Sequence, residues 1–333
     1  MKMTTSASRM LVLMAILLAT TIPVVAQKTH KINHLVDSLL SKRYWRADID
    51  TNYIIRPQTK WTLTARLNMS GSRIRTDEKD NGLPVVMEVD ADNKATLTVG
   101  VSYMGMSLNL SLNPSKLLGK YKDTEFGFKS YGRRFGFDFA YQDAQNFKGW
   151  YEEDGNRTNF KISEGTFRVQ TLNMNAYYVF NYRKFSYPAA FSHSYIQRRS
   201  AGSFLLAASG QGQKGEILGS EKKQEYKMSN FGIGAGYGYN YVPGKGWLLH
   251  ISSLPTFIVY TNSSIIQGDY SHPIHYVFPE FIITARGAVV KQIGRNMFAG
   301  LSVMHSVTTI GDKDELAFRN IKWQGHLYFG YRL

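Results

Sequence analysis

Short turns and long polar connections alternate along residues 60–333, and this order constrains the fold more than any other feature of the chain. The short turns lie between stretches with the period-two alternation of β-strands, at 132–133, 181–184, 243–245 and 294–296. The longer polar segments include 70–93, 144–164, 211–227, 261–275 and 310–319. Transmembrane β-barrels have this order, because their periplasmic turns are short and their outer loops are long. Soluble β-sandwiches follow no such rule.

Counting the alternating stretches predicts an all-β chain, a transmembrane antiparallel β-barrel of about 12 strands, with both termini in the periplasm. Residues 165–209 leave 10 to 14 strands open. The apolar phase breaks there near Thr171, Pro188 interrupts the pattern, and YIQRR offers another turn.

A hairpin is expected at Ala95–Asn113, where the apolar residues change from odd to even numbers. A two-residue turn at Met104-Gly105 explains the change, since Tyr103 then faces Met106 and one face stays apolar. The other face carries Ser, Thr, Asn and Gly. This polarity favours a lipid-facing wall over the alternative of a soluble exported barrel, whose solvent face would carry many Lys and Glu.

The N-terminus reads as a signal peptide over residues 1–26, with two basic residues, an apolar run and small residues before Gln27. A periplasmic segment, 27–59, is expected to follow, with a short amphipathic helix over 30–43. That helix either covers one end of the barrel, 60–333, or binds another envelope protein, for which the outer loops are a second candidate surface. The chain has no cysteine, so the exported protein must be stable without disulfides.

The last strand, IKWQGHLYFGYRL, alternates to its final residue. Phe329, Tyr331 and Leu333 share one apolar face, and they resemble the C-terminal signal that outer-membrane barrels present to their assembly machinery. A terminal Leu departs from the Phe that is commoner in such signals.

The net charge of +15 does not indicate nucleic-acid binding, because a signal peptide precedes aromatic strands and no nucleic-acid motif is present. We expect Arg66, Arg168, Lys322 and His326 to face the lumen. An anion-favouring lumen follows, with a network of internal ion pairs, including Asp138, as the alternative. Four alternate glycines, Gly232 to Gly238, indicate tight curvature or the close approach of a plug.

Catalytic and metal motifs are weak. His193 lies between Ser192 and Ser194, which leaves a lipid-modifying barrel enzyme, an acyl hydrolase or acyltransferase, as an alternative function. His272 and His275 form a pair without an evident third metal ligand, and the acidic run 152–154 suits a solvated loop tip. No catalytic residue, metal or cofactor is therefore assigned.

The blocks SYGRRFGFDFAYQ, YYVFNYRKFSYPAAFSHSY, RRSAGSFLLAASGQ, FGIGAGYGYNYV and FAGLSV resemble an uncharacterised family of Gram-negative outer-membrane proteins, domain-of-unknown-function family 4421. The resemblance spans roughly residues 60–333 and implies an outer-membrane barrel, with outer-membrane lipids and the assembly machinery as partners. The expected role is that of a non-enzymatic structural, transport-related or complex-forming envelope protein with a largely occluded lumen. The family carries no known catalytic or binding residues.

Overall fold

The computed structural model of the chain describes residues 48–80, 83–103, 106–112, 124–162, 165–274, 276, 279–312 and 316–333. The signal peptide and the helix expected at 30–43 lie outside these residues. The barrel belongs to one compact unit, Ile49–Leu333. Within the described residues, no helix is both long and apolar enough to cross a membrane.

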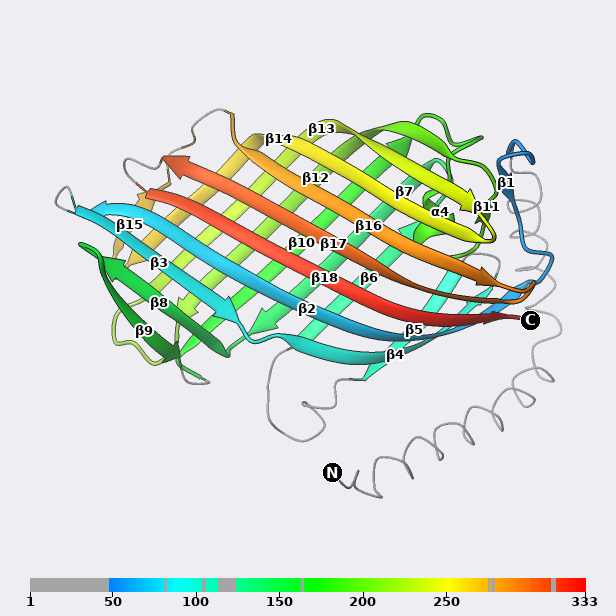
Figure 1. Ribbon diagram of the computed structural model, residues 1–333. Coiled ribbons are helices and arrows are strands. Elements are labelled where there is room, and N and C mark those ends of the chain that lie inside the picture. Colours follow the sequence, from blue (N-terminus) through cyan, green and yellow to red (C-terminus); the bar gives the residue numbers. More distant parts are fainter. Residues whose placement is uncertain are drawn as a thin grey trace, which may run out of the picture. The chain divides into compact units, whose positions relative to one another are not determined.

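One antiparallel sheet of sixteen strands dominates the unit (Figure 1). Four of its strands form short distal extensions, and the other twelve form the wall. The wall strands are β2 (Trp61–Asp80), β4 (Lys94–Tyr103), β5 (Met106–Leu112), β6 (Thr124–Tyr131), β7 (Phe135–Ala144), β10 (Phe167–Val179), β12 (Ala201–Ile217), β13 (Gln224–Gly244), β14 (Trp247–Gln267), β16 (Phe281–Ile293), β17 (Met297–Asp312) and β18 (Leu316–Arg332).

The first and last wall strands pair with each other, from Thr62 with Arg332 to Glu78 with Leu316. This pairing joins the N-terminal and C-terminal strands of the wall side by side, as they lie in a β-barrel. The other wall strands pair with their neighbours in sequence, except that β5 and β6 share no backbone pairs within the described residues. The chain is therefore an all-β transmembrane barrel, and the predicted twelve strands are confirmed.

The hairpin expected from the phase change is present. Tyr103 pairs with Met106 and Val99 with Leu110, so β4 and β5 have the predicted register. This register keeps the apolar residues of both strands on one face of the sheet.

The barrel has two rims. We call the end at which β2 begins and β18 ends, near Trp61 and Leu333, the proximal rim, and the opposite end the distal rim (Figure 1). At the distal rim, strands continue where polar loops were predicted. The four extensions are β3 (Leu83–Ala91), β8 (Phe147–Glu153), β9 (Asn156–Ile162) and β15 (Tyr270–Pro273).

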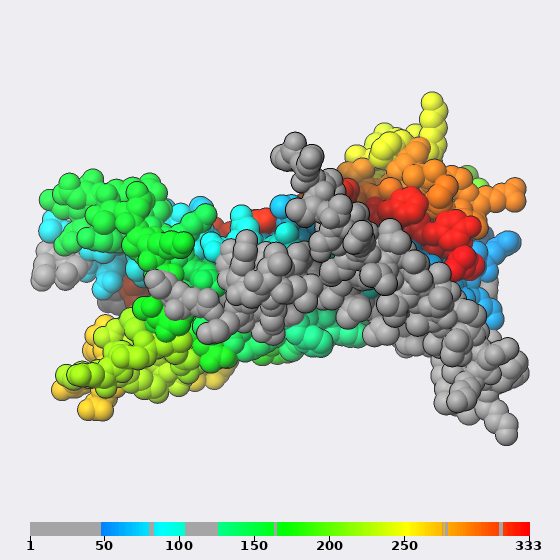
Figure 2. All heavy atoms as spheres, turned by 90° about the horizontal axis from the view of Figure 1, so that it is seen from below, coloured from blue at the N-terminus to red at the C-terminus, as the bar shows by residue number. Residues whose placement is uncertain are grey.

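The loops predicted at 70–93 and 144–164 are therefore wrong. β2 runs on to Asp80 and pairs with β3 along residues 73–80, and β8 pairs with both β3 and β9. The β8–β9 hairpin turns through Asp154 and Gly155, whose φ angles of 47° and 76° suit a type I′ turn. Figure 2 shows this hairpin (green) and the β12–β13 end (yellow-green) as separate projections.

At the proximal rim, one connection is long. A turn is present at 181–184, as predicted, but it does not join two wall strands directly, because residues 180–200 separate β10 from β12. They contain the short helix α4 (Tyr187–Phe191) and the strand β11 (Ile196–Gln197), which pairs with β1 (Ile54–Ile55). Through this pairing, residues 49–59 join the compact unit of the barrel rather than a separate segment. We call residues 180–200 the plug segment.

Candidate functional site in the barrel lumen

Contacts between strands that are far apart in the sheet identify its inner face. Arg286 of β16 forms a buried ion pair with Asp138 of β7. Lys129 Nζ of β6 donates a hydrogen bond of 2.8 Å to Gln324 Oε1 of β18. These pairs span many intervening strands, so their side chains meet across a lumen.

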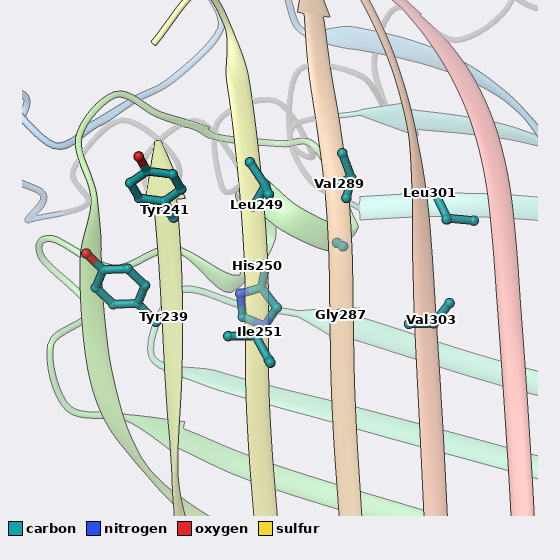
Figure 3. A pocket seen from close by; sticks show the side chains of 10 residues that line it. Tyr239, Tyr241, Leu249, His250, Ile251, Gly287, Val289, Leu301 and Val303 are labelled. Atoms are coloured by element: carbon teal, nitrogen blue, oxygen red, sulfur yellow. The ribbon is translucent and has the colours of Figure 1, made fainter. Parts of the chain in front are cut away.

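The outer face is apolar near the proximal rim. Ile251 is 70% exposed and Phe204 is 69% exposed, although both are large hydrophobic residues. Around Gly287, the side chains of β13, β14, β16 and β17 border an apolar depression of about 370 Å³ (Figure 3). Exposure of this kind is expected where acyl chains replace water as the solvent.

The height of the apolar surface matches a membrane. On β13 the exposed aromatic residues run from Phe231 to Tyr241, ten residues along the strand. With a rise of about 3.3 Å per residue and a strand tilt of about 40°, this stretch spans about 25 Å, the height of the lipid-facing band of outer-membrane barrels. We call the part of each wall strand with this apolar outer face the proximal half, and the remainder the distal half.

Aromatic side chains mark the proximal rim. The rings of Trp61 and Tyr103 lie 4.6 Å apart, and Lys291 Nζ lies 4.8 Å from the Trp247 ring centroid. Phe329, Tyr331 and Leu333 are exposed on the outer face, as their alternation predicts. Their role as an assembly signal stays a prediction.

The plug segment lies inside the proximal half. Tyr187 packs on Tyr177 of β10, with ring centroids 4.6 Å apart, and its hydroxyl donates a 2.7 Å hydrogen bond to Ser252 Oγ of β14. On the other side, the His193 ring lies 4.4 Å from the rings of Phe298 of β17 and Tyr328 of β18. A segment that touches strands around the wall in this way fills the lumen between them.

Polar side chains also anchor the plug segment. Asn240 Nδ2 of β13 donates to the Ser186 carbonyl and to Gln197 Oε1, both at 3.0 Å. His250 Nδ1 lies 2.7 Å from Asn240 Oδ1, and His250 Nε2 lies 3.0 Å from Ser252 Oγ. Buried polar groups are stabilising only when they are satisfied, so this chain of bonds selects one seated position for the plug segment.

The close approach of a plug, one of the two predicted causes, explains one position of the glycine row. A Cβ on Gly238 would lie 2.9 Å from Phe185 of the plug segment, whereas one on Gly234 or Gly236 would lie 2.2 Å or less from a backbone oxygen of β14. These distances leave no room for a side chain. The row therefore permits close strand approach along β13 and plug contact at one position.

Three of the four predicted lumen residues lie on the inner face. Arg66 and His326 line one cavity of about 210 Å³, and Lys322 lines a smaller neighbouring one. His326 Nδ1 lies 2.8 Å from Asn68 Oδ1 on the adjacent strand.

The prediction for Arg168 is wrong. Its guanidinium pairs with Asp143 at 2.5 Å and with Glu216 at 3.8 Å on the outer face of the distal half. The neighbouring Val169 is buried with Ile282 and Phe318 on the inner face. The prediction assumed that Val169 faces lipid, but in the distal half the apolar side chains of the wall point inward.

The family of the chain is now clear. Residues 48–333 match the family model described as Domain of unknown function (DUF4421). The chain belongs to this family. A comparison with curated proteins finds no match.

Solved structures resemble this DUF4421 barrel at low identity. The outer membrane protease OmpT from Escherichia coli is 7% identical, with a TM-score of 0.45, over 83% of this chain and 97% of that one. The translocator domain of the autotransporter NalP from Neisseria meningitidis is 10% identical, with a TM-score of 0.30, over 83% and 89%. The outer membrane protein OprG from Pseudomonas aeruginosa is 9% identical, with a TM-score of 0.27, over 84% and 97%. Identities this low transfer no activity to the DUF4421 chain.

The candidate catalytic histidine of the DUF4421 barrel is buried in aromatic packing. His193 is 1% exposed, and Ser192 Oγ lies 3.0 Å from Ser194 Oγ instead of bonding to the imidazole. Burial lowers the pKa of His193 well below its ordinary value, and the charges of Arg66 and Arg332 lower it further. The imidazole is therefore neutral at physiological pH.

Metal sites find no support among the described residues, where no group of three or more His, Asp or Glu side chains is placed to hold an ion. His275 lies outside the described residues, so the predicted His272–His275 pair stays a prediction. Glu152 and Glu153 belong to β8, in the hairpin that projects at the distal rim.

Sequence reasoning missed the plug segment and the strands at the distal rim. The plug segment carries a signal in FSYPAAF, where Ser186 precedes a proline at the start of a helix. The Ser186 side chain accepts a hydrogen bond from the Ala189 amide and caps α4.

Proposed function

We propose that this DUF4421 chain is an outer-membrane β-barrel that does not conduct solutes through its lumen and that acts as a structural or complex-forming component of the envelope. The observation that carries the proposal is the plug segment. It contacts β10, β13, β14, β17 and β18 from inside the proximal half.

The free energy gained by burying the aromatic rings of the plug segment supports a plug that stays in the lumen. Phe185 and Tyr187 have no exposed surface, and burial of an aromatic side chain of this size contributes about 1.5–3 kcal/mol. Withdrawal of the plug segment would expose these rings, break the hydrogen bond that Asn240 donates to Ser186, and break the one that Tyr187 donates to Ser252. A spontaneous open state is therefore rare.

The distal half supplies a second barrier. Its inner face carries a cluster of buried apolar residues, which we call the distal core. The distal core comprises Ile74, Val89, Ala91, Ala144, Phe147, Val169, Met228, Ile258, Ile282, Ile310 and Phe318. Side chains that pack across a lumen in this way exclude water, and a water-filled pore needs the opposite.

The difference between the two rims supports one orientation of the barrel in the membrane. The distal half has a charged outer face and long strand extensions, which suit a position beyond the bilayer, whereas the proximal half has the lipid-facing band. We place the proximal rim and both termini in the periplasm. The proposal includes no enzymatic activity, since the His193 imidazole packs against the rings of Phe298 and Tyr328 and accepts no hydrogen bond from either adjacent serine.

Planar-bilayer recording of the mature chain tests the proposal. We expect no steady conductance from the intact protein or from a variant in which a short Gly/Ser linker replaces residues 185–197, because the distal core still packs across the lumen. Conductance is expected when the same replacement is combined with Phe147→Ser and Phe318→Ser, which open the distal core. A matched variant that lacks residues 27–47 but keeps the plug segment should stay closed. Nanosiemens conductance from the intact protein would refute a closed lumen, and conductance that appears only without residues 27–47 would assign the barrier to the N-terminal segment.

Folding must be verified for each variant. A closed barrel has no free strand edge and should migrate differently on denaturing gels before and after boiling. Purified protein should also lack lipase turnover, both intact and as His193→Ala. Turnover that His193→Ala abolishes would replace the proposed role with the enzymatic one.

A further inference from the structure

We propose that the middle of the lumen holds a binding site for a phosphate-bearing anion, between the plug segment and the distal core. The site is the cavity of about 210 Å³ lined by Arg66, Lys129 and His326. This inference goes beyond the structural role proposed above and does not depend on it.

The charge of the cavity lining is one-sided. Among the described residues that line the cavity, Arg66 and Lys129 carry permanent positive charge, and none is an aspartate or a glutamate. Asp138, which lies opposite Lys129 in the pairing of β6 with β7, lines the smaller neighbouring cavity and forms an ion pair with Arg286. No described carboxylate lies within ion-pair distance of the Arg66 guanidinium. A guanidinium removed from bulk water requires a partner, and an anion beside Arg66 in the cavity provides one.

The neutral lining groups are hydrogen-bonding groups of the kinds that recognise oxyanions. They include Asn68, Ser70, Thr96, Thr98, Ser192 and Gln324. Hydroxyl and amide groups donate to phosphate oxygens, and a guanidinium binds them through two parallel N–H donors.

The framework of the site is preorganised by bonds that cross the lumen. Lys129 of β6 is held by Gln324 of β18, and Asn68 of β2 lies against His326 while its Nδ2 donates to Thr98 Oγ1 at 2.6 Å. Arg66, Lys129 and His326 all line the same cavity, so the three basic groups lie around one space. Groups that are already positioned lose little entropy when a ligand binds.

The plug segment forms the proximal wall of the cavity through Phe191 and Ser192. A phosphate group at Arg66 therefore lies beside the plug segment rather than in a continuous channel. The ligand is either free phosphate or the headgroup of a phospholipid, and the chemistry of recognition is the same for both.

Isothermal titration calorimetry tests the site with the full mature chain, folded in the uncharged detergent dodecyl maltoside. One arm titrates inorganic phosphate and the other dihexanoyl phosphatidylglycerol. We expect saturable binding of one ligand per chain in at least one arm. Binding of phosphate identifies a free solute as the ligand, and binding of the lipid alone identifies a headgroup.

Variants locate the binding. Arg66→Gln and Lys129→Gln should each weaken the affinity about 10- to 100-fold, because each removes a charge-assisted hydrogen bond. Arg168→Gln is the matched control, since it removes the same charge from the outer face and should leave the affinity unchanged. If Arg66→Gln does not fold, as judged by equal migration on denaturing gels before and after boiling, Lys129→Gln and Arg66→Lys are used for the test instead. Absence of saturable binding in both arms, or an equal loss in Arg168→Gln, would overturn the site.

Discussion

The proximal and distal halves of the wall are built from the same strands, yet they place their apolar side chains on opposite faces. On β2 the outward residues are Leu67 and Met69 in the proximal half, and Arg73 and Arg75 in the distal half. The inward residues change the other way, from polar Asn68 to Ile74 of the distal core. Along the whole strand, successive side chains alternate between the outer and the inner face without interruption. The apolar residues occupy the outward positions in the proximal half and the inward positions in the distal half.

The difference teaches that each wall strand passes through two solvents. In the proximal half the outer solvent is lipid and the lumen is polar, whereas in the distal half the outer solvent is water and the interior is a packed apolar core. The distal half thus follows the rules of a soluble β-barrel. A change of apolar phase along such a chain marks the bilayer boundary as well as a turn.

The largest expected effect is in the polar lumen. Arg286→Met should cost about 3–5 kcal/mol in the free energy of unfolding, because it leaves the carboxylate of Asp138 buried without its partner. The two side chains are 1% and 5% exposed. The double variant Asp138→Leu/Arg286→Met should recover most of the loss. Urea titrations followed by tryptophan fluorescence measure these values.

The control for this prediction comes from the outer face of the distal half. Arg168→Met removes the partner of Asp143, but these side chains are 34% and 14% exposed. A pair that water and salt can screen should contribute less than about 1 kcal/mol. Equal losses at both sites would mean that the lumen is as well hydrated as the surface, which would contradict the comparison.

The next effect concerns lipid. Ile251→Arg places a charge in the lipid-facing band and should cost about 2–4 kcal/mol in folding into lipid vesicles. Gln170→Arg, on the outer face of the distal half next to Arg168 and Lys214, should cost far less because water hydrates the new charge. Similar folding yields for the two variants would argue against the assigned bilayer boundary.

The register and the side-chain directions of the wall were predictable from the sequence where the outer face of a strand meets a single solvent along the predicted stretch. Strict alternation in β4 and β18 gave the correct register and the outward face of Phe329 and Leu333. The distal half was not predictable in the same way, since Arg168 and Val169 alternate correctly but with the apolar phase reversed. Periodicity alone says which residues share a face, and it does not say which face meets lipid.

The lumen was predictable only in part. An inward position for Arg66 and His326 follows from alternation, but their meeting with Lys129 depends on how β6 and β18 approach across the barrel. The plug segment is a tertiary feature in which local propensity competes with packing against the wall. Its phase breaks and Pro188 were visible, whereas the rings that receive it, Phe298 and Tyr328, are more than 100 residues away in the sequence.

A smaller effect sharpens the comparison inside the distal half. Ile310→Val removes one methyl group from the distal core, where Ile310 is 1% exposed, and should cost about 0.5–1.5 kcal/mol. Ile251→Val in the proximal half should cost less, because acyl chains are as apolar as the lost methyl and fill the space. The same urea titration in lipid vesicles measures both. A larger loss for Ile251→Val would place the tighter packing on the lipid side.

The smallest effect concerns charge on the outer face of the distal half. Glu225, beyond the lipid-facing stretch of β13, lies 2.9 Å from Lys223, 3.0 Å from Lys227 and 3.5 Å from Lys214. Burial by itself raises the pKa of Glu225, but the hydrogen bonds and charges of Lys223 and Lys227 outweigh it and lower the pKa from 4.5 to about 2.

A carboxyl group whose pKa is lowered by folding stabilises the protein above its unfolded pKa, and this stability is lost as the pH falls through the folded value. The difference in unfolding free energy between the parent chain and Glu225→Gln should therefore be present at pH 7 and decline between about pH 4.5 and 2. Because the three lysines are partly exposed, we expect less than about 1 kcal/mol, reduced further in 1 M salt. Unfolding titrations at pH 7, 4 and 2.5 measure the decline. A difference that grows on acidification would mean that the lysines do not hold Glu225 ionised, and the charged outer face would then contribute nothing to the stability of the distal half.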